Sequence, residues 1–120
     1  MMRKVLTLIS VLLLTGCTET SFESVTTKKA KELMDEGKVI VLDVRTPEEY
    51  NSGHIPGSNL APLQVLEGMS EDLEKDKSYI LVCRSGNRSQ QAADILTSKG
   101  FKNVYNMTGG MNEWTYEIEQ

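Results

Sequence analysis

The apolar positions of this chain fall into short continuous runs separated by longer segments with helical spacing. The runs at 39–42 and 79–82 are apolar throughout, a pattern typical of central strands buried on both faces of a parallel sheet. Shorter strands are predicted at 22–25, 60–62 and 104–105. Because predicted strands and helices alternate from residue 22 onward, we predict an α/β fold with an open, mostly parallel sheet and helices on both faces.

The segments between these runs carry signals for the beginning and the end of helices. Thr26 or Thr27 can cap a helix that ends at Gly37, since glycine is common just after a helix. Thr46 can cap a second helix, because Pro47 suits its first turn. The predicted helices are 27–36, a short one from Pro47, one or two within 63–76, 89–99, and a last short one after Gly110.

Composition and charge narrow the possible functions. The chain has 120 residues, of which 39% are apolar and 25% charged, which fits one folded domain and argues against disorder. The net charge is −4 and no stripe of lysine and arginine is visible, so we expect no nucleic-acid partner. Nothing in this short acidic chain favours an oligomer, and we expect a monomer.

We expect the first residues to lie outside the folded domain. Arg3 and Lys4 precede an apolar run at 5–14 that only Thr7 and Ser10 interrupt. An apolar run of this length behind a positively charged start is typical of a signal peptide, and it is short for a helix that spans a membrane.

This run ends in Leu-Thr-Gly-Cys at 14–17, which resembles the lipobox of bacterial lipoproteins. The resemblance implies that residues 1–16 are removed, that Cys17 carries lipid (palmitate included), that 17–21 form a tether, and that 22–120 form the domain. Acyl chains anchor a protein because each buried methylene contributes about 0.8 kcal/mol. The implied location is the bacterial cell envelope, outside the cytoplasm and attached to a membrane. Ordinary cleavage and an uncleaved anchor helix are the alternatives.

Cys83 stands where the second long apolar run ends and a polar loop begins. If Cys17 carries lipid, Cys83 has no disulfide partner within the chain. Arg84 and Arg88 lie on either side of Gly86 in this loop, and a loop between a strand and a helix gathers backbone N–H groups that favour anions. We therefore predict a reactive Cys83 thiol with a lowered pKa. Buried free cysteines are commonly inert, but a core cysteine needs no polar, basic loop behind it.

Three motifs support a family assignment. They are Leu-Asp-Val-Arg-Thr-Pro-Glu-Glu-Tyr at 42–50 with Gly-His-Ile-Pro-Gly at 53–57, Cys-Arg-Ser-Gly-Asn-Arg-Ser at 83–89, and Gly-Gly-Met-Asn-Glu-Trp at 109–114. In this order and spacing they resemble the motifs of single-domain rhodaneses, a family of sulfurtransferases related in fold to some protein phosphatases. The resemblance covers most of the chain between Val25 and Trp114.

The resemblance implies a two-step transfer of sulfur. Cys83 would attack the outer sulfur of a small donor anion such as thiosulfate and hold it as a persulfide, which a thiol or cyanide would then accept. Arg88 would face the bound anion and Arg84 would screen the mouth of the site. No metal and no organic cofactor are implied. The implied anion-binding residues are Arg84, Ser85, Gly86, Asn87, Arg88 and Ser89.

Other polar residues of the motifs receive supporting roles. Asp43 follows the first long apolar run, and parallel strands bring that end close to the Cys83 loop. We therefore expect Asp43 to accept hydrogen bonds from the loop amides or from Arg88. Arg45 is expected to pair with Glu49, four residues further along a helical turn. His54 is the only histidine, and the resemblance gives it a structural role in a turn.

Three other functions remain open at this point. A phosphatase or arsenate reductase is disfavoured, because such relatives have five residues between cysteine and arginine and this chain has four between Cys83 and Arg88. A persulfide carrier without turnover needs the same loop, so the sequence does not separate it from an enzyme. A domain that only binds a partner has no need of a nucleophile in a basic loop.

Overall fold

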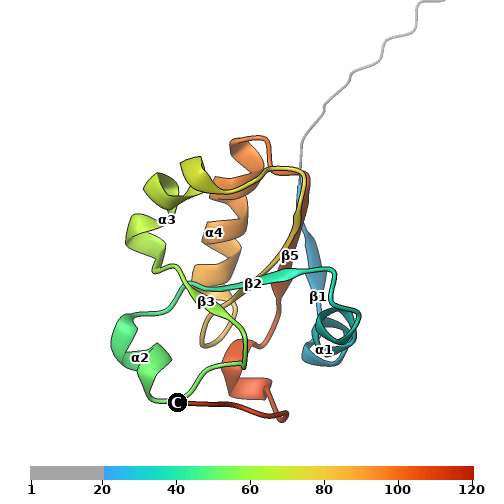
Figure 1. The fold of residues 1–120 in the computed structure, drawn as a ribbon, viewed down its shortest axis with the longest axis vertical. Coiled ribbons are helices and arrows are strands. Elements are labelled where there is room, and N and C mark those ends of the chain that lie inside the picture. The colour runs from blue at the N-terminus through green and yellow to red at the C-terminus, as the bar shows by residue number, and fades with distance from the viewer. Residues whose placement is uncertain (1–20) are drawn as a thin grey trace, which may run out of the picture.

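A computed structural model describes residues 21–120 of the chain. The predicted signal peptide, Cys17 and nearly all of the predicted tether therefore lie outside the described residues. The model shows one five-stranded sheet in the order β1-β5-β4-β2-β3, with every neighbouring pair parallel (Figure 1). The strands are β1 (Glu23–Val25), β2 (Ile40–Asp43), β3 (Asn59–Leu60), β4 (Ser78–Val82) and β5 (Asn103–Met107). The predicted α/β class is confirmed.

Two of the helices begin at threonine caps. The side chain of Thr26 accepts a hydrogen bond from the backbone of Lys29, and Thr46 forms a reciprocal capping box with Glu49, which satisfies N–H groups that a helix start leaves free. The helices are α1 (Thr27–Asp35), α2 (Pro47–Asn51), α3 (Leu63–Met69) and α4 (Asn87–Ser98), with single 3₁₀ turns η1 (Ser70–Asp72) and η2 (Gly110–Glu113).

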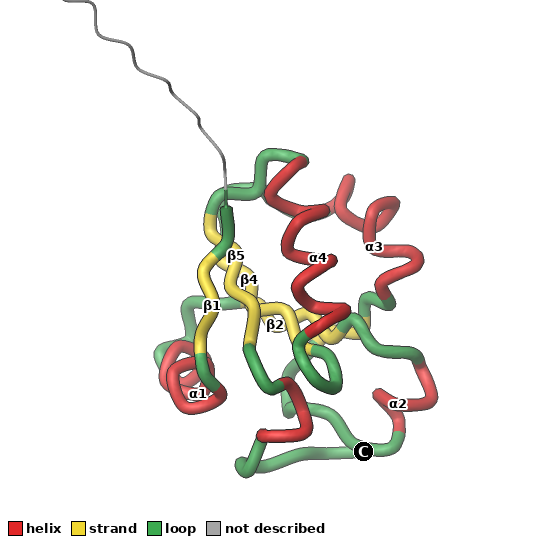
Figure 2. Tube along the Cα trace, turned by 180° about the vertical axis from the view of Figure 1, so that it is seen from behind, coloured by secondary structure: helices red, strands yellow, loops and turns green. Residues whose placement is uncertain are grey.

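Helices cover both faces of the sheet, because alternate strand residues point to opposite sides. Leu42 and Leu81 pack with α3 and α4 on one face. Val41 and Ile80 pack with α1 on the other face. Figures 1 and 2 show α1 on one side of the strands and α3 with α4 on the other. Within residues 21–120, no helix is both long and apolar enough to cross a bilayer.

The observed bounds differ from the predicted ones where tertiary structure decides them. The edge strand β3 begins at Asn59, one residue earlier than expected, because it pairs with Leu42 and Asp43 of β2. Helix α4 begins at Asn87, two residues early, since Gly86 takes a left-handed backbone with φ of 107° and turns the chain into the helix. This early start brings the first turn of α4 close to the end of β4.

The register of the central strands positions the candidate site. Asp43 at the end of β2 lies opposite Val82 at the end of β4. Both strands therefore end at one edge of the sheet, where open α/β folds commonly bind ligands. Cys83 follows immediately after β4 at this edge.

Candidate active site

Cys83 sits at the base of the loop that joins β4 to α4. Its side chain is buried, with 1% of the residue exposed. The backbone N–H of Gly86 donates to the Cys83 sulfur at 3.0 Å, and that sulfur lies 3.4 Å from the hydroxyl oxygen of Ser89. The loop therefore curls around the sulfur and directs donors toward it.

These donors lower the pKa of the Cys83 thiol. Burial acts to raise this pKa, but hydrogen bonds from the hydroxyl and backbone N–H of Ser89 and from the backbone N–H groups of Gly86 and Ser85 outweigh burial. The direction agrees with the sequence prediction. The largest favourable causes are neutral donors that bond to the thiolate directly, and the charge of Arg88 also interacts with Cys83.

Replacement of Ser89 by alanine is expected to raise the pKa of Cys83. The Ser89 hydroxyl is buried beside the sulfur, and its loss removes a donor to the thiolate, so the thiol then loses its proton only at higher pH. The measurement is thiolate absorbance in the ultraviolet against pH. Ser85→Ala is the control, because Ser85 contributes its backbone N–H. An unchanged titration in Ser89→Ala, or an equal shift in both variants, would contradict this reading.

The predicted anion-binding residues divide into two groups. Arg84, Ser85 and Asn87 are exposed, whereas Gly86 and Arg88 are half-buried and Ser89 is buried. The exposed position of Arg84 is compatible with a place at the mouth of the site. The sulfur accepts from the backbone N–H groups of Ser85, Gly86 and Ser89 and lies beside the Ser89 hydroxyl.

The terminal nitrogens of Arg88 bond to a carboxylate, while the charge of Arg88 still interacts with Cys83. These two nitrogens donate to the two carboxylate oxygens of Glu49, at 2.8 and 2.9 Å. The predicted pair between Arg45 and Glu49 is therefore wrong. The four-residue spacing suggested a local pair, but Arg88 reaches Glu49 from α4 and satisfies both oxygens, which a bidentate guanidinium does best.

Asp43 is also paired differently from the prediction. It accepts from the side chain of Arg45 at 2.9 Å on one oxygen and 2.8 Å on the other, and from the Arg45 backbone N–H at 3.1 Å. Its expected bonds to the loop amides or to Arg88 are absent among residues 21–120. The Arg45 side chain also donates to the carbonyl of Gly53 at 2.8 Å, so this buried pair joins the end of β2 to the segment after α2.

The turn at Gly109 and Gly110 supports the Cys83 loop, a role that sequence reasoning missed. The backbone N–H groups of Met111 and Asn112 donate to the carbonyls of Cys83 and Arg84, at 2.8 and 2.9 Å. A side chain at Gly110 would come within 2.5 Å of the Cys83 carbonyl oxygen. The paired glycines in the last motif were the available signal for this close approach.

His54 has the structural position that the resemblance implies. Its Nδ1 lies 2.8 Å from the carbonyl of Tyr50, and the two rings stack with centroids 3.7 Å apart. The backbones of His54 and Glu119 also exchange two hydrogen bonds. These contacts tie the chain end to the segment after α2.

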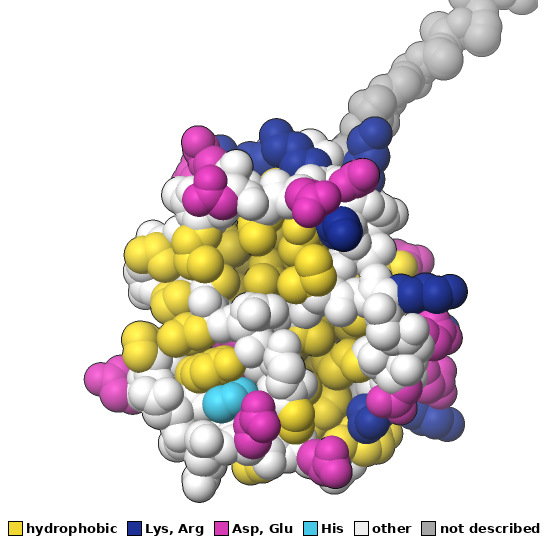
Figure 3. All heavy atoms as spheres, viewed as in Figure 1, with side chains coloured by type: hydrophobic (Ala, Val, Ile, Leu, Met, Phe, Trp, Pro, Cys, Tyr) yellow, Lys and Arg dark blue, Asp and Glu magenta, His cyan; other side chains and the backbone are white. Residues whose placement is uncertain are grey.

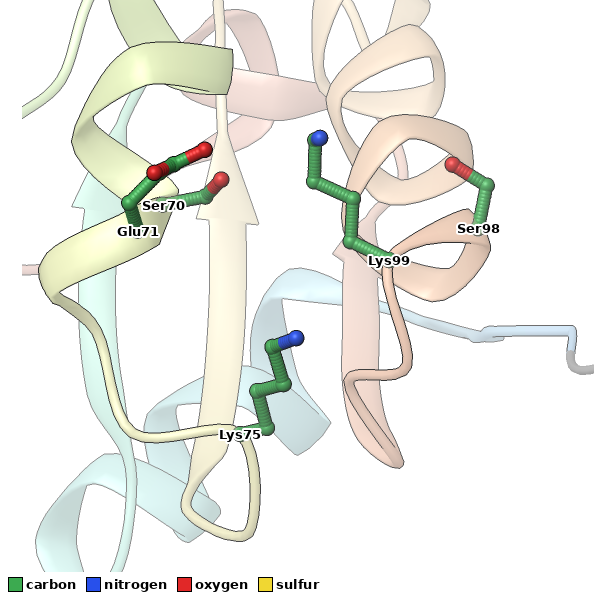
Figure 4. A pocket seen from close by; sticks show the side chains of 5 residues that line it. All are labelled: Ser70, Glu71, Lys75, Ser98 and Lys99. Carbon is green, nitrogen blue, oxygen red and sulfur yellow. The ribbon is translucent and has the colours of Figure 1, made fainter.

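Two cavities lie away from Cys83. One of about 480 Å³ lies near the far end of α4, as Figure 4 shows, and is lined by Ser70, Glu71, Lys75, Ser98 and Lys99. Another of about 300 Å³ opens beside the first residues of β2, with which the short strand β3 does not pair, and includes Val39, Ile40 and Pro56, on a face where Figure 3 shows apolar side chains gathered. Within residues 21–120, no cluster of three His, Cys, Asp or Glu side chains is arranged to hold a metal ion.

The fold and the Cys83 loop place the chain in a known class. The model of the rhodanese-like domain family matches residues 26–117, and the chain belongs to this family. It is similar to the crystal structure of a rhodanese-like domain protein from Staphylococcus aureus, with a TM-score of 0.75 and 34% identity over 82% of this chain and 97% of that one.

Curated relatives carry names that refer to sulfur. The thiosulfate sulfurtransferase GlpE of Pseudoalteromonas translucida is 36% identical over 94 residues, which cover 78% of this chain and 90% of the relative. YrkF of Bacillus subtilis, provisionally named a sulfur carrier protein, is 40% identical over 79 residues, which cover 66% of this chain and 43% of the relative.

Proposed function

We propose that the protein is a sulfurtransferase that carries sulfur as a persulfide on Cys83. The observation that carries this proposal is the position of the Cys83 sulfur, 3.0 Å from the Gly86 N–H inside a loop whose hydrogen bonds lower the thiol pKa. A lowered thiol pKa increases the fraction of thiolate, which is the nucleophilic form, and the same donors stabilise a negative charge on an attached sulfur.

The proposed transfer takes place in two nucleophilic substitutions at sulfur. The Cys83 thiolate attacks the outer sulfur of thiosulfate or of a persulfide or polysulfide; the donor's sulfur–sulfur bond breaks, and its electron pair leaves with sulfite or a thiolate. A thiol or cyanide then attacks the outer sulfur of the Cys83 persulfide, and the Cys83 thiolate leaves. Neither step requires a metal ion or an organic cofactor.

The size of the loop favours sulfur over phosphate. Four residues separate Cys83 from Arg88, one fewer than in the related phosphatases, and the ring of N–H groups is correspondingly small. Both terminal nitrogens of Arg88 are engaged by Glu49. A tetrahedral phosphate or arsenate needs the larger ring and a free arginine fork, so the geometry supports transfer of a single sulfur atom.

Replacement of Cys83 by serine is expected to abolish sulfur transfer. The whole chain is purified in mild detergent, incubated with thiosulfate or an alkyl persulfide, and examined by intact mass. Cyanide is then added and thiocyanate is followed. Wild-type protein gains one sulfur atom and releases it repeatedly, while Cys83→Ser gains none. Absence of an adduct with every donor in the wild type would refute the proposal.

A carrier function is the second candidate, because YrkF is provisionally named a sulfur carrier. A carrier would gain sulfur on Cys83 in the same experiment but would discharge it slowly to small acceptors. The rate of thiocyanate formation separates the two functions.

We also propose that Cys17 carries lipid and holds the domain at a membrane of the bacterial cell envelope, outside the cytoplasm. The apolar run at 5–14 and the Leu-Thr-Gly-Cys tetrapeptide at 14–17 support this location. The intact-mass measurement on the whole chain also tests the proposed lipidation of Cys17, because the mass shows whether residues 1–16 are absent and whether acyl chains are present.

A further inference from the structure

Glu49 holds Arg88 beside the Cys83 loop through an extended set of contacts. One carboxylate oxygen accepts from Arg88 at 2.8 Å and from the backbone and hydroxyl of Thr46, both at 3.1 Å, while the other accepts from Arg88 at 2.9 Å. The hydrogen bond from Arg88 lowers the pKa of Glu49 to about 2. Glu49 is therefore ionised throughout the physiological pH range, and it compensates the charge of Arg88.

Arg45 is compensated in the same way, because Asp43 pairs with it in a buried ion pair. Asp43 and Glu49 thus each offset the charge of one arginine close to the Cys83 loop.

The sulfur donors differ greatly in the charge that they bring to a site where Glu49 already offsets Arg88. Attack of the Cys83 thiolate on thiosulfate brings three negative charges together. Attack on an alkyl persulfide brings together two, or only one when the donor is protonated. In the protonated case the thiolate bonds to the terminal sulfur, the donor's sulfur–sulfur bond breaks, and the departing alkyl thiolate takes the proton. Like charges at close range repel strongly in a partly buried site. The thiolate therefore meets more repulsion from thiosulfate than from an alkyl persulfide.

We propose that Glu49 is a positioning residue that sets donor selectivity: by engaging both terminal nitrogens of Arg88, it disfavours the thiosulfate dianion and leaves alkyl persulfides of low charge as the preferred donors. This inference rests on the proposed sulfur transfer through Cys83. It assigns no contact with the reacting sulfur to Glu49, which acts through Arg88.

The variant Glu49→Gln tests this inference. Glutamine is also a capping-box residue, so α2 keeps its cap while Arg88 loses its counter-charge. The control is Glu48→Gln, which removes the same charge from an exposed neighbour in the first turn of α2. The second-order rate of sulfur loading on Cys83 is measured by intact mass with thiosulfate and with hydroxyethyl persulfide, using the whole chain.

We expect Glu49→Gln to raise the ratio of the thiosulfate rate to the persulfide rate by about tenfold, because an uncompensated positive charge then lies near the donor. The ratio in Glu48→Gln should stay at the wild-type value. High salt should shrink the effect of Glu49→Gln, because mobile ions screen the exposed part of this charge. The titration of the Cys83 thiolate should also move to lower pH in Glu49→Gln alone.

Two results would overturn the inference. If Glu49→Gln lowers both loading rates by the same factor, Glu49 only supports the loop. If both rates stay at their wild-type values, the charge of Glu49 does not affect the donor. Either result leaves the proposed function standing as long as wild-type Cys83 gains sulfur. A wild-type protein that gains none from either donor refutes the proposed function itself.

Discussion

Replacement of Asp43 by alanine is expected to lower the free energy of unfolding by about 3–5 kcal/mol. Asp43 is fully buried and supplies the only carboxylate paired with Arg45 within residues 21–120, at 2.8 Å. Its removal leaves a guanidinium that is itself 7% exposed without a counter-charge. The measurement is urea unfolding followed by circular dichroism, analysed as a two-state transition.

Asp35→Ala provides the matched control for this experiment. Asp35 pairs with Lys31 at 2.6 Å, but its side chain is 63% exposed. An exposed pair of this kind contributes between zero and about 1 kcal/mol, so the control should unfold close to the wild-type urea concentration. Similar losses in the two variants would mean that burial does not set the importance of the Asp43 pair.

Replacement of Gly110 by alanine is expected to slow sulfur loading of Cys83 by about a hundredfold. The new methyl group would lie 2.5 Å from the Cys83 carbonyl oxygen and 2.5 Å from the Arg84 carbonyl, so the turn and the loop cannot both keep their positions. Displacement of the loop moves the N–H groups that stabilise the attached sulfur. The measurement is the rate of mass gain with an alkyl persulfide, together with urea unfolding.

The control for Gly110 is Gly37→Ala, which separates contact from backbone strain. Gly37 has φ of 74° and open space around the added methyl group, whereas Gly110 has φ of 56° and collides with the loop. Both variants incur the cost of about 1–2 kcal/mol for an L-residue with a left-handed backbone. Only Gly110→Ala should also slow sulfur loading; equal loading rates would show that the loop tolerates the displacement.

The fold was predictable because its signals are local and strong. The apolar runs that became β2 and β4, the threonine caps at Thr26 and Thr46, and Gly37 each specify one element without help from the rest of the chain. The position of Cys83 at the end of a strand was predictable for a related reason: the loop after it departs sharply in polarity from the strand before it. The bounds of β3 were less predictable, since pairing with β2 determines them.

The partners of the charged side chains could not be predicted in the same way. Spacing alone suggested that Arg45 pairs with Glu49, because only near neighbours along the chain are visible in a sequence. In the folded chain Arg88, distant in sequence, takes Glu49, and Arg45 takes Asp43, two residues away. The choice depends on where α4 lies beside α2, which is a property of the packed structure.

The parallel direction of all five strands separates the two ends of the domain. The chain enters the sheet at Glu23, the start of β1. The Cys83 loop lies toward the other end of the strands, beyond the end of β4 (Figures 1 and 2). In a domain attached to a surface through the residues before β1, the Cys83 loop would lie at the end of the sheet away from the point of attachment. In this arrangement, sulfur carried on Cys83 would be offered to acceptors arriving from the surrounding solution.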